Sequence, residues 1–278
     1  MNWPAMLRTI SLLAIFFQTT SLPLQSQDVT PRLELAKRLK PLPDQLVVLT
    51  FDDAVSSHAT FVAPLLKKYG FGGTFFICEF PPDFDSDKKK YMTWEQIRSL
   101  HEMGFEVASH THTHANVAKL TREQLVQELA YIEDRCLELG ISRPVSFAYP
   151  GYETHPDALQ ILTQRGYLFA RAGEDRTYRP FLDHPLLVPS FSTTGPDKKR
   201  VLDALKQAKN GEIVVLTVHG VPDYAHPRVT TPPELFETYL DYLKDNHYTV
   251  AALRDLAQFI DPGQARKVPT GATHSSKQ

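Results

Sequence analysis

The chain has 278 residues and a hydrophobic fraction of 42%, which suffices for a packed core and excludes a wholly disordered protein. A formal net charge of -2, with 22% charged residues, leaves no basic footprint for nucleic acid or for an anionic membrane surface. We therefore predict no nucleic-acid partner and no substrate that is held by bulk charge.

The first residues have the layout of a secretory signal peptide. Arg8 precedes an apolar run over 10–17, and a polar region with small residues follows through position 26. This run is too short for a membrane span, which needs about 20 apolar residues. We predict a signal peptide over 1–26, a lead-in over 27–44, and a secreted, periplasmic or cell-envelope protein. No stable membrane span is expected after processing.

From Leu46 onward, short apolar runs alternate with amphipathic segments, and no linker or charge block interrupts them. This continuity predicts one domain over 45–262. Strands that are separated by helices indicate a parallel sheet that is covered by helices. The predicted strands are 46–51, 73–77, 105–108, 145–148, 167–170, 187–188, 213–218 and 248–251.

The clearest predicted helix covers 121–139. Thr121 is a suitable N-terminal cap, and Gly140 ends the helix. A spacing near 3.6 residues gives this helix one apolar face. The residues of that face are Leu125, Leu129, Ile132 and Cys136. Further helices are expected after Thr93, over 201–209 and over 233–244.

We predict an α/β fold, a distorted (β/α) barrel of about seven to eight parallel strands. The count of about eight repeating units favours this barrel over an open dinucleotide-binding sheet. No glycine-rich loop follows the first strand. The polar residues 263–278 are predicted to form a disordered tail. We expect Cys78 and Cys136 to stay unpaired, because their elements place them on opposite faces and a disulfide needs Cα atoms within about 7 Å.

Three groups of chemistry-bearing residues follow predicted strands. Asp52 and Asp53 follow the first strand, the histidine cluster 110–114 follows the third, and His219 follows the seventh. Parallel α/β folds place active sites beyond the carboxyl ends of their strands. Unpaired carboxylates beside a buried strand cost several kcal/mol, and a divalent cation would compensate them. The sequence therefore predicts a metal site with an acid-base partner beside it.

His110 and His114 are four residues apart, which brings both imidazoles to one side of the segment. A turn after the third strand directs His112 away, so we place it at the periphery. Two histidines and one aspartate leave coordination positions open for water and substrate. This ligand set suits zinc and other divalent first-row metals. One aspartate of the pair binds the metal, and the other acts as a base or orients one.

At these residues the chain resembles the polysaccharide deacetylases with a NodB-like homology domain, over about 45–260. The tetrapeptide Thr50-Phe51-Asp52-Asp53 matches the first motif of that family, and the cluster 110–114 matches its metal-binding motif. The segment Leu216-Thr217-Val218-His219 matches a late motif. All three motifs occur in order at strand ends, which makes the resemblance specific.

The resemblance implies a NodB-like barrel that binds one divalent metal ion, most readily zinc. It implies that Asp53, His110 and His114 hold the metal, that Asp52 is the general base, and that His219 is the general acid. The implied reaction is removal of acetyl groups from an N- or O-acetylated polysaccharide or oligosaccharide by metal-activated water.

The third motif of the family departs from its usual R-x-P-Y form. It reads Ala148-Tyr149-Pro150-Gly151-Tyr152, with Ala148 at the position of the arginine that normally orients the base. Arg171, after the fifth strand, either takes over this role at the same rim or is an ordinary surface residue. No acidic and tryptophan pattern of the fourth motif is visible in 173–176.

The altered motif still supplies candidates for substrate binding. Gly151 is expected to offer a backbone N–H to the oxyanion, which needs no side chain. Tyr149 and Tyr152 either stack on a sugar ring or pack in the core.

Three other functions compete with a secreted, metal-dependent deacetylase. A hydrolase of a small amide C–N bond would need a narrow cleft, closed by the loop 79–91 and the loop after His219. A catalytically inactive carbohydrate-binding member is suggested by the missing arginine, although Asp52 and His219 are retained. A ferrous oxygenase normally has an all-β fold, which the predicted helices oppose.

Overall fold

The computed structural model describes Met1 and residues 39–265. The chain divides into two units, Met1–Arg38 and Leu39–Gln278, and the fold described below is that of the second. Apart from Met1, the predicted signal peptide (1–26) lies outside the described residues. So do most of the predicted lead-in (27–44) and residues 266–278 of the predicted tail. Disorder is wrong for 263–265, because these residues belong to a short helix, α8 (Pro262–Ala265).

Eight parallel strands form the sheet, and each coincides with a predicted apolar run within a few residues. Their order is β2-β3-β4-β5-β6-β7-β1-β8, and an additional pairing joins β1 to β2. The first seven strands thereby form a closed barrel, and β8 is an extra strand. The strands are β1 (Leu46–Phe51), β2 (Thr74–Ile77), β3 (Glu106–Ser109), β4 (Ser146–Ala148), β5 (Phe169–Glu174), β6 (Val188–Ser192), β7 (Val214–Val218) and β8 (Thr249–Ala251).

The barrel closes at its carboxyl end because the two halves of β1 have different neighbours. The first half, from Leu46 to Val48, pairs with β8. The last two residues, Thr50 and Phe51, pair with the start of β2. Since all of these pairings are parallel, the carboxyl ends of the strands meet at one rim. The predicted barrel and its parallel strands are confirmed.

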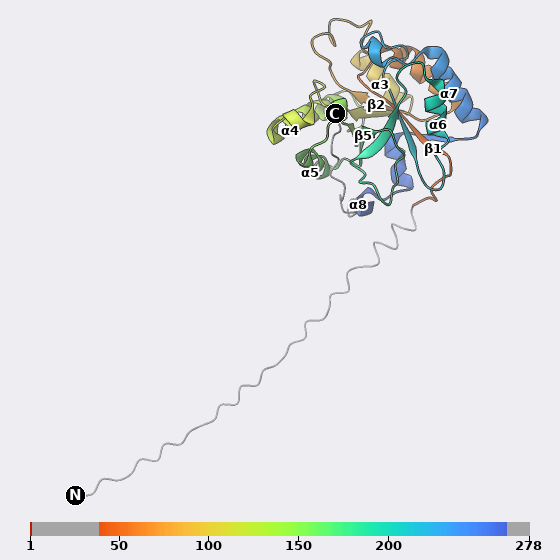
Figure 1. Ribbon diagram of the computed structural model, residues 1–278. Helices are drawn as coiled ribbons and strands as arrows, with labels where there is room; N and C mark the ends of the chain where they lie inside the picture. The colour runs from red at the N-terminus through yellow and green to blue at the C-terminus, as the bar shows by residue number, and fades with distance from the viewer. Residues whose placement is uncertain (2–38, 266–278) are drawn as a thin grey trace. The chain divides into compact units, whose positions relative to one another are not determined.

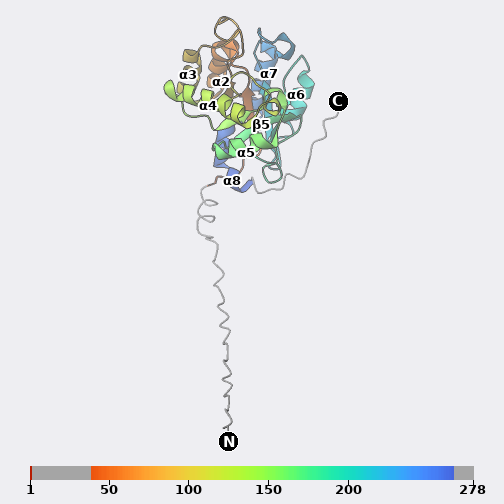
Figure 2. The same ribbon diagram turned by 90° about the vertical axis from the view of Figure 1, so that its left-hand side faces the viewer.

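Helices surround the strands (Figures 1 and 2). The longest is α4 (Arg122–Glu138), which begins as predicted with Thr121 accepting a hydrogen bond from the Gln124 backbone N–H and is followed by Gly140 at φ 73°. None of the described helices is long and apolar enough to cross a membrane. The other α-helices are α2 (Ala63–Tyr69), α3 (Trp94–Glu102), α5 (Pro156–Gln164), α6 (Lys198–Leu205) and α7 (Pro233–Asp245). The short helices are a π-helix, η1 (His58–Val62), and the 3₁₀ helices η2 (Val117–Lys119), η3 (Pro150–Tyr152), η4 (Pro227–Val229) and η5 (Leu253–Gln258).

Capping residues explain where helices α6 and α3 begin in the structure, compared with their predicted starts. Helix α6 begins three residues before the predicted start because the Asp197 carboxylate accepts a hydrogen bond from the Arg200 backbone N–H. Helix α3 begins at the expected place, where Thr93 and Gln96 form a reciprocal capping box.

The core lies inside the barrel and between the barrel and its helices. Every residue of β1 is buried, and the Phe51 ring stacks on Phe75 with centroids 4.8 Å apart. Cys78 and Cys136 are both buried and unpaired, as predicted. The apolar face of α4 is buried at all four of its predicted positions.

The burial of α4 predicts which leucines stabilise the fold. Leu129 is fully buried, whereas Leu137 on the same helix is 56% exposed. We expect Leu129→Ala to lower the free energy of unfolding by about 2–5 kcal/mol, because it leaves a cavity. Leu137→Ala, as the matched control, should change it by about 0.5 kcal/mol or less. Urea denaturation monitored by circular dichroism measures both, and equal losses would contradict the packing of this face.

Candidate active site

Strand register places the predicted catalytic pair side by side. Phe51 of β1 pairs with Val218 of β7, so the next residues along the two strands are Asp52 and His219. The Asp52 backbone N–H donates to the Val218 carbonyl at 3.0 Å. His110 follows β3 in the same way, since its N–H donates to the last residue of β2 at 2.9 Å. The three predicted groups therefore meet at one rim.

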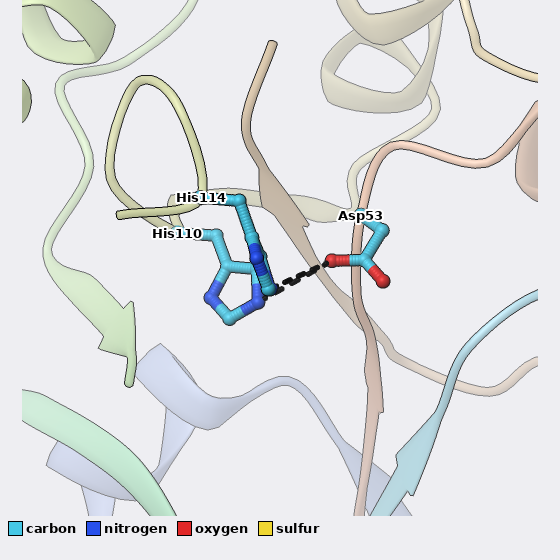
Figure 3. A group of neighbouring side chains, drawn as sticks. All are labelled: Asp53, His110 and His114. Atoms are coloured by element: carbon cyan, nitrogen blue, oxygen red, sulfur yellow. Dashed lines mark ion pairs between the residues drawn. The ribbon is translucent and has the colours of Figure 1, made fainter. Parts of the chain in front are cut away.

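Asp53, His110 and His114 offer ligand atoms that all lie within 4.8 Å of one another. The Oδ1 atom of Asp53 is 3.5 Å from Nε2 of His110 and 3.5 Å from Nε2 of His114. Figure 3 shows the carboxylate facing the two imidazoles, which come from the loop after β3. The structure thus brings the three predicted metal ligands together.

The chemistry of these three residues fits a divalent cation. Asp53 Oδ1 is buried and has no hydrogen-bond partner among the residues that the structure describes. An orphaned buried carboxylate oxygen is costly unless it binds a cation. Nδ1 of His110 lies 2.8 Å from the Ala148 carbonyl, so it carries the proton and leaves Nε2 free as a ligand.

The protonation states also suit metal binding. Burial alone would raise the pKa of Asp53, but His110 and the charges of His219 and His114 outweigh it and hold this pKa well below its usual range. Burial, followed by the neighbouring His110, lowers the pKa of His114 to about 4. Both side chains are therefore deprotonated at neutral pH, which is the state that a metal requires.

Two of these candidate ligands have a left-handed backbone conformation. Asp53 has φ 72°, the following Ala54 has φ 51°, and His114 has φ 55°. Left-handed conformations cost about 1–3 kcal/mol in residues other than glycine, and they cluster at functional sites. At Asp53 this conformation turns the chain directly after Asp52, so the two neighbouring carboxylates face different partners.

Arg171 provides the partner of Asp52. Its side chain is fully buried, and its Nη2 lies 2.5 Å from Asp52 Oδ2. In the register between β4 and β5, Arg171 is the direct neighbour of Ala148, the position where the resemblance leads us to expect an arginine. The guanidinium reaches Asp52 from the next strand. The alternative of an ordinary surface residue is wrong.

Aromatic rings enclose the guanidinium on two sides. Its central carbon lies 5.1 Å from the ring centroid of Tyr152 and 5.5 Å from that of Phe76. Oδ1 of Asp52 has no hydrogen-bond partner in the described part of the chain. One oxygen of Asp52 is thus fixed by Arg171, and the other is free to take a proton.

His219 faces the same centre, and a buried histidine holds its backbone. Nε2 of His219 lies 3.9 Å from Asp53 Oδ2. The carbonyl of His219 lies 2.7 Å from Nε2 of His58, which must therefore carry the proton. Burial lowers the pKa of His58, so this imidazole is neutral. His58 was not among the predicted site residues.

The carboxylates and imidazoles open into a cavity of about 620 Å³. Gly151 lines it with φ 63°, and Tyr152, which is 37% exposed, follows with φ 64°. Tyr149 borders the cavity but is fully buried, and its hydroxyl donates to the Leu186 carbonyl at 3.0 Å. The assignment of Tyr149 to substrate binding is therefore corrected, because its ring packs in the core.

The structure adds residues that the motifs did not indicate. Phe80 and His226 line the cavity, and the buried Asp223 contacts His226 from the same loop. The sequence signal for this pair was the long, proline-containing loop after His219, which was expected to border the cleft without a role for either residue. His112 lies outside the metal group, as predicted, but its Nε2 is 3.1 Å from Glu79 Oε2 and is not simply solvated.

A closed parallel barrel with this group at its carboxyl rim is the NodB-like (β/α)-barrel class. Residues 39–170 match the family model described as polysaccharide deacetylase. The resemblance inferred from the motifs is thereby confirmed. The match ends before Arg171 and His219, so the roles of these two residues depend on the geometry.

Curated and structural relatives agree with this family. The chain is 27% identical over 144 residues to the putative polysaccharide deacetylase YxkH of Bacillus subtilis (strain 168), which covers 51% of this chain and 50% of YxkH. The chain thus spans about half the length of that relative.

Two solved structures share the fold. The Xyl-CE4 domain of a multidomain xylanase from the hindgut metagenome of Trinervitermes trinervoides has TM-score 0.54 and 21% identity, covering 77% of this chain and 90% of that one. The chitin deacetylase of Colletotrichum lindemuthianum has TM-score 0.57 and 18% identity, covering 85% and 97%. At these identities the likeness shows the fold alone.

The contact between Arg171 and Asp52 predicts strong energetic coupling. Arg171→Met leaves a buried carboxylate uncompensated, and we expect a loss of about 3–5 kcal/mol in the free energy of unfolding. The double variant Asp52→Asn/Arg171→Met should recover part of this loss, because it removes both charges. Urea denaturation of the metal-free proteins measures the cycle, and strictly additive losses would argue against a coupled pair.

The neutral His58 predicts a pH dependence of stability. Its pKa in the fold lies below the ordinary value, so the unfolded chain binds more protons as the pH falls below about 6.5. Stability therefore decreases toward acid, by at most about 1.4 kcal/mol per pH unit for this group. His58→Gln keeps an amide donor for the His219 carbonyl and removes the titration. Metal-free His58→Gln should have a shallower pH slope in urea denaturation, and an unchanged slope would contradict the neutral state.

Proposed function

We propose that the protein is an exported, metal-dependent hydrolase that removes acetyl groups from N- or O-acetylated carbohydrate. The orphaned Oδ1 of Asp53 carries the proposal, because it faces two imidazoles at the edge of a cavity that Asp52 and His219 also line. Zinc is the first candidate, since catalytic zinc sites combine three nitrogen and oxygen ligands with one open position. The signal-peptide layout of residues 1–26 supports export.

The two aspartates have different roles: Asp53 binds the metal, and Asp52 accepts a proton. Asp53, His110 and His114 would hold the cation, which supplies Lewis acidity that activates water and polarises an acetyl carbonyl. Arg171 fixes Oδ2 of Asp52 and leaves Oδ1 to take the proton of the attacking water. The base is therefore oriented before substrate arrives.

His219 donates the proton that the leaving group needs. It lies beside Asp52 at the strand ends, and its imidazole lines the cavity, where it donates a proton to the departing amine or alcohol. Gly151 forms part of the cavity wall, and its backbone N–H is the proposed donor to the developing oxyanion. This donor requires no side chain at position 151.

The cavity favours a carbohydrate over a small amide. Phe80 is the only described residue of the loop 79–91 that lines it, so this loop does not close the cleft as a small-amide hydrolase would require. The inactive-member alternative was suggested by the missing arginine, and the contact of Arg171 with Asp52 removes that reason.

Substitution of each aspartate tests the proposal. We expect Asp52→Ala to keep the metal and lose turnover, because it removes only the base. Asp53→Ala should lose both, because it removes a ligand. Asp134→Ala, at an exposed position on α4, is the matched control and should behave as wild type. Bound metal is measured by elemental analysis, and acetate release is measured on chitin oligomers, peptidoglycan and acetylated xylan.

Two outcomes would count against these assignments. A wild-type protein that binds metal but releases no acetate from any of the three substrates would rule out the proposed deacetylase. Full metal occupancy in Asp53→Ala would show that the division between the aspartates is wrong.

A further inference from the structure

His226 brings a further imidazole to the site from the loop after β7. It lies seven residues beyond His219, is about half buried and lines the cavity. Its Nδ1 is 3.7 Å from Oδ2 of Asp53. It does not belong to the group formed by the three metal ligands. Its place beside Asp53 therefore calls for a different role.

The two oxygens of Asp53 face different surroundings. Oδ1 faces the ligand nitrogens of His110 and His114, at 3.5 Å each. Oδ2 points the other way, toward His226 at 3.7 Å and His219 at 3.9 Å. A carboxylate that binds metal through one oxygen is usually oriented through its other oxygen by a neighbouring donor. His226 is the closer of the two imidazoles in that position.

The neighbours of His226 fix which nitrogen carries the proton. Nδ1 faces two carboxylate oxygens, Oδ2 of Asp53 and Oδ2 of Asp223, the latter at 3.4 Å. Ionised carboxylates only accept, so Nδ1 carries the proton, and among the described residues it forms no hydrogen bond with either oxygen. Nε2 is 3.3 Å from the Tyr91 hydroxyl, which is able to donate to it. The N–H edge of the imidazole therefore faces Asp223, the nearer carboxylate, and Asp53 beside it.

The loop that carries His226 is fixed by buried contacts. Asp223 is buried, and its carboxylate accepts hydrogen bonds from the backbone N–H groups of His226 at 2.7 Å and Gly220 at 3.2 Å. A Cβ at Gly220 would lie 2.4 Å from the Asp223 Cα, so only glycine permits this approach. The Phe80 ring packs at 4.7 Å from the His226 ring and at 4.7 Å from the His114 ring.

We propose that His226 is a positioning residue for the metal ligand Asp53. Its Nδ1–H faces Oδ2 and keeps Oδ1 aimed between His110 and His114, while Asp223 holds the imidazole in place. The loop after β7 thus contributes to the metal site without supplying a ligand. This role depends on one part of the proposed function, which is that Asp53 binds a metal.

Zinc affinity tests the proposal without any substrate. Competition with a chromophoric chelator gives the Kd of the metal-free protein for Zn²⁺. We expect His226→Ala to weaken binding by about 10–100-fold, the usual effect of losing a group that orients a ligand. His226→Asn should retain most of the affinity, because its amide N–H replaces that of Nδ1. Tyr91→Phe is the matched control, since it removes only the hydroxyl that faces Nε2 and keeps the ring, and it should bind zinc as wild type does.

Two further measurements separate positioning from a general loss of structure. The metal-free His226→Ala protein should keep the urea midpoint of wild type, and its Co²⁺ absorption spectrum should shift because the carboxylate ligand is reoriented. Zinc binding as tight as wild type in His226→Ala would overturn the proposal. Equal weakening in His226→Ala and His226→Asn would also overturn it. If wild type binds zinc without releasing acetate, the proposed function fails and the positioning role is still measured.

Discussion

Two neighbouring carboxylates buried at the end of β1 are the constraint on which the site depends. Asp52 and Asp53 are 2% and 4% exposed, and two adjacent buried anions cannot both stay ionised without compensating charge. The left-handed backbone at Asp53 separates them, so that Asp52 meets the Arg171 guanidinium and Asp53 meets a cluster of imidazoles. The two groups thereby acquire different chemistry although they are adjacent in the sequence.

The closed barrel brings the partners of Asp52 and Asp53 to the same height, at the carboxyl ends of the strands. The two aspartates, the two clustered histidines, Arg171 and His219 come from or directly follow β1, β3, β5 and β7, and β7 and β1 are direct neighbours in the barrel. The parallel register fixes the height of each, as the pairing of Phe51 with Val218 does for Asp52 and His219. The fold therefore defines which residues meet before any loop contributes.

Local patterns predicted most of the barrel, the paired aspartates and the two clustered histidines, because strand ends, caps and histidine spacing are visible in a few consecutive residues. The choice of Asp53 over Asp52 as the expected metal ligand came from the family resemblance. The sequence did not decide whether Arg171 contacts Asp52 or lies on the surface. The answer depends on the strand register, which sets this residue beside Ala148. The burial of Tyr149 and the placement of His226 depend on contacts with Leu186 and Asp223. Such contacts join segments through packing and carry no periodic signal.

An arginine on β5 in place of one on β4 is compatible with the proposed metal site because position 148 still contributes through its backbone. The Ala148 carbonyl accepts the Nδ1 proton of His110, an interaction that any residue at this position provides. Arg171 meanwhile contacts both Asp52 and the ring of Tyr152, which directly follows Gly151. One buried guanidinium thus connects the proposed base to the turn that carries the proposed oxyanion donor. With alanine at position 148, the contact with Asp52 comes from β5, and the backbone carbonyl that holds His110 is kept.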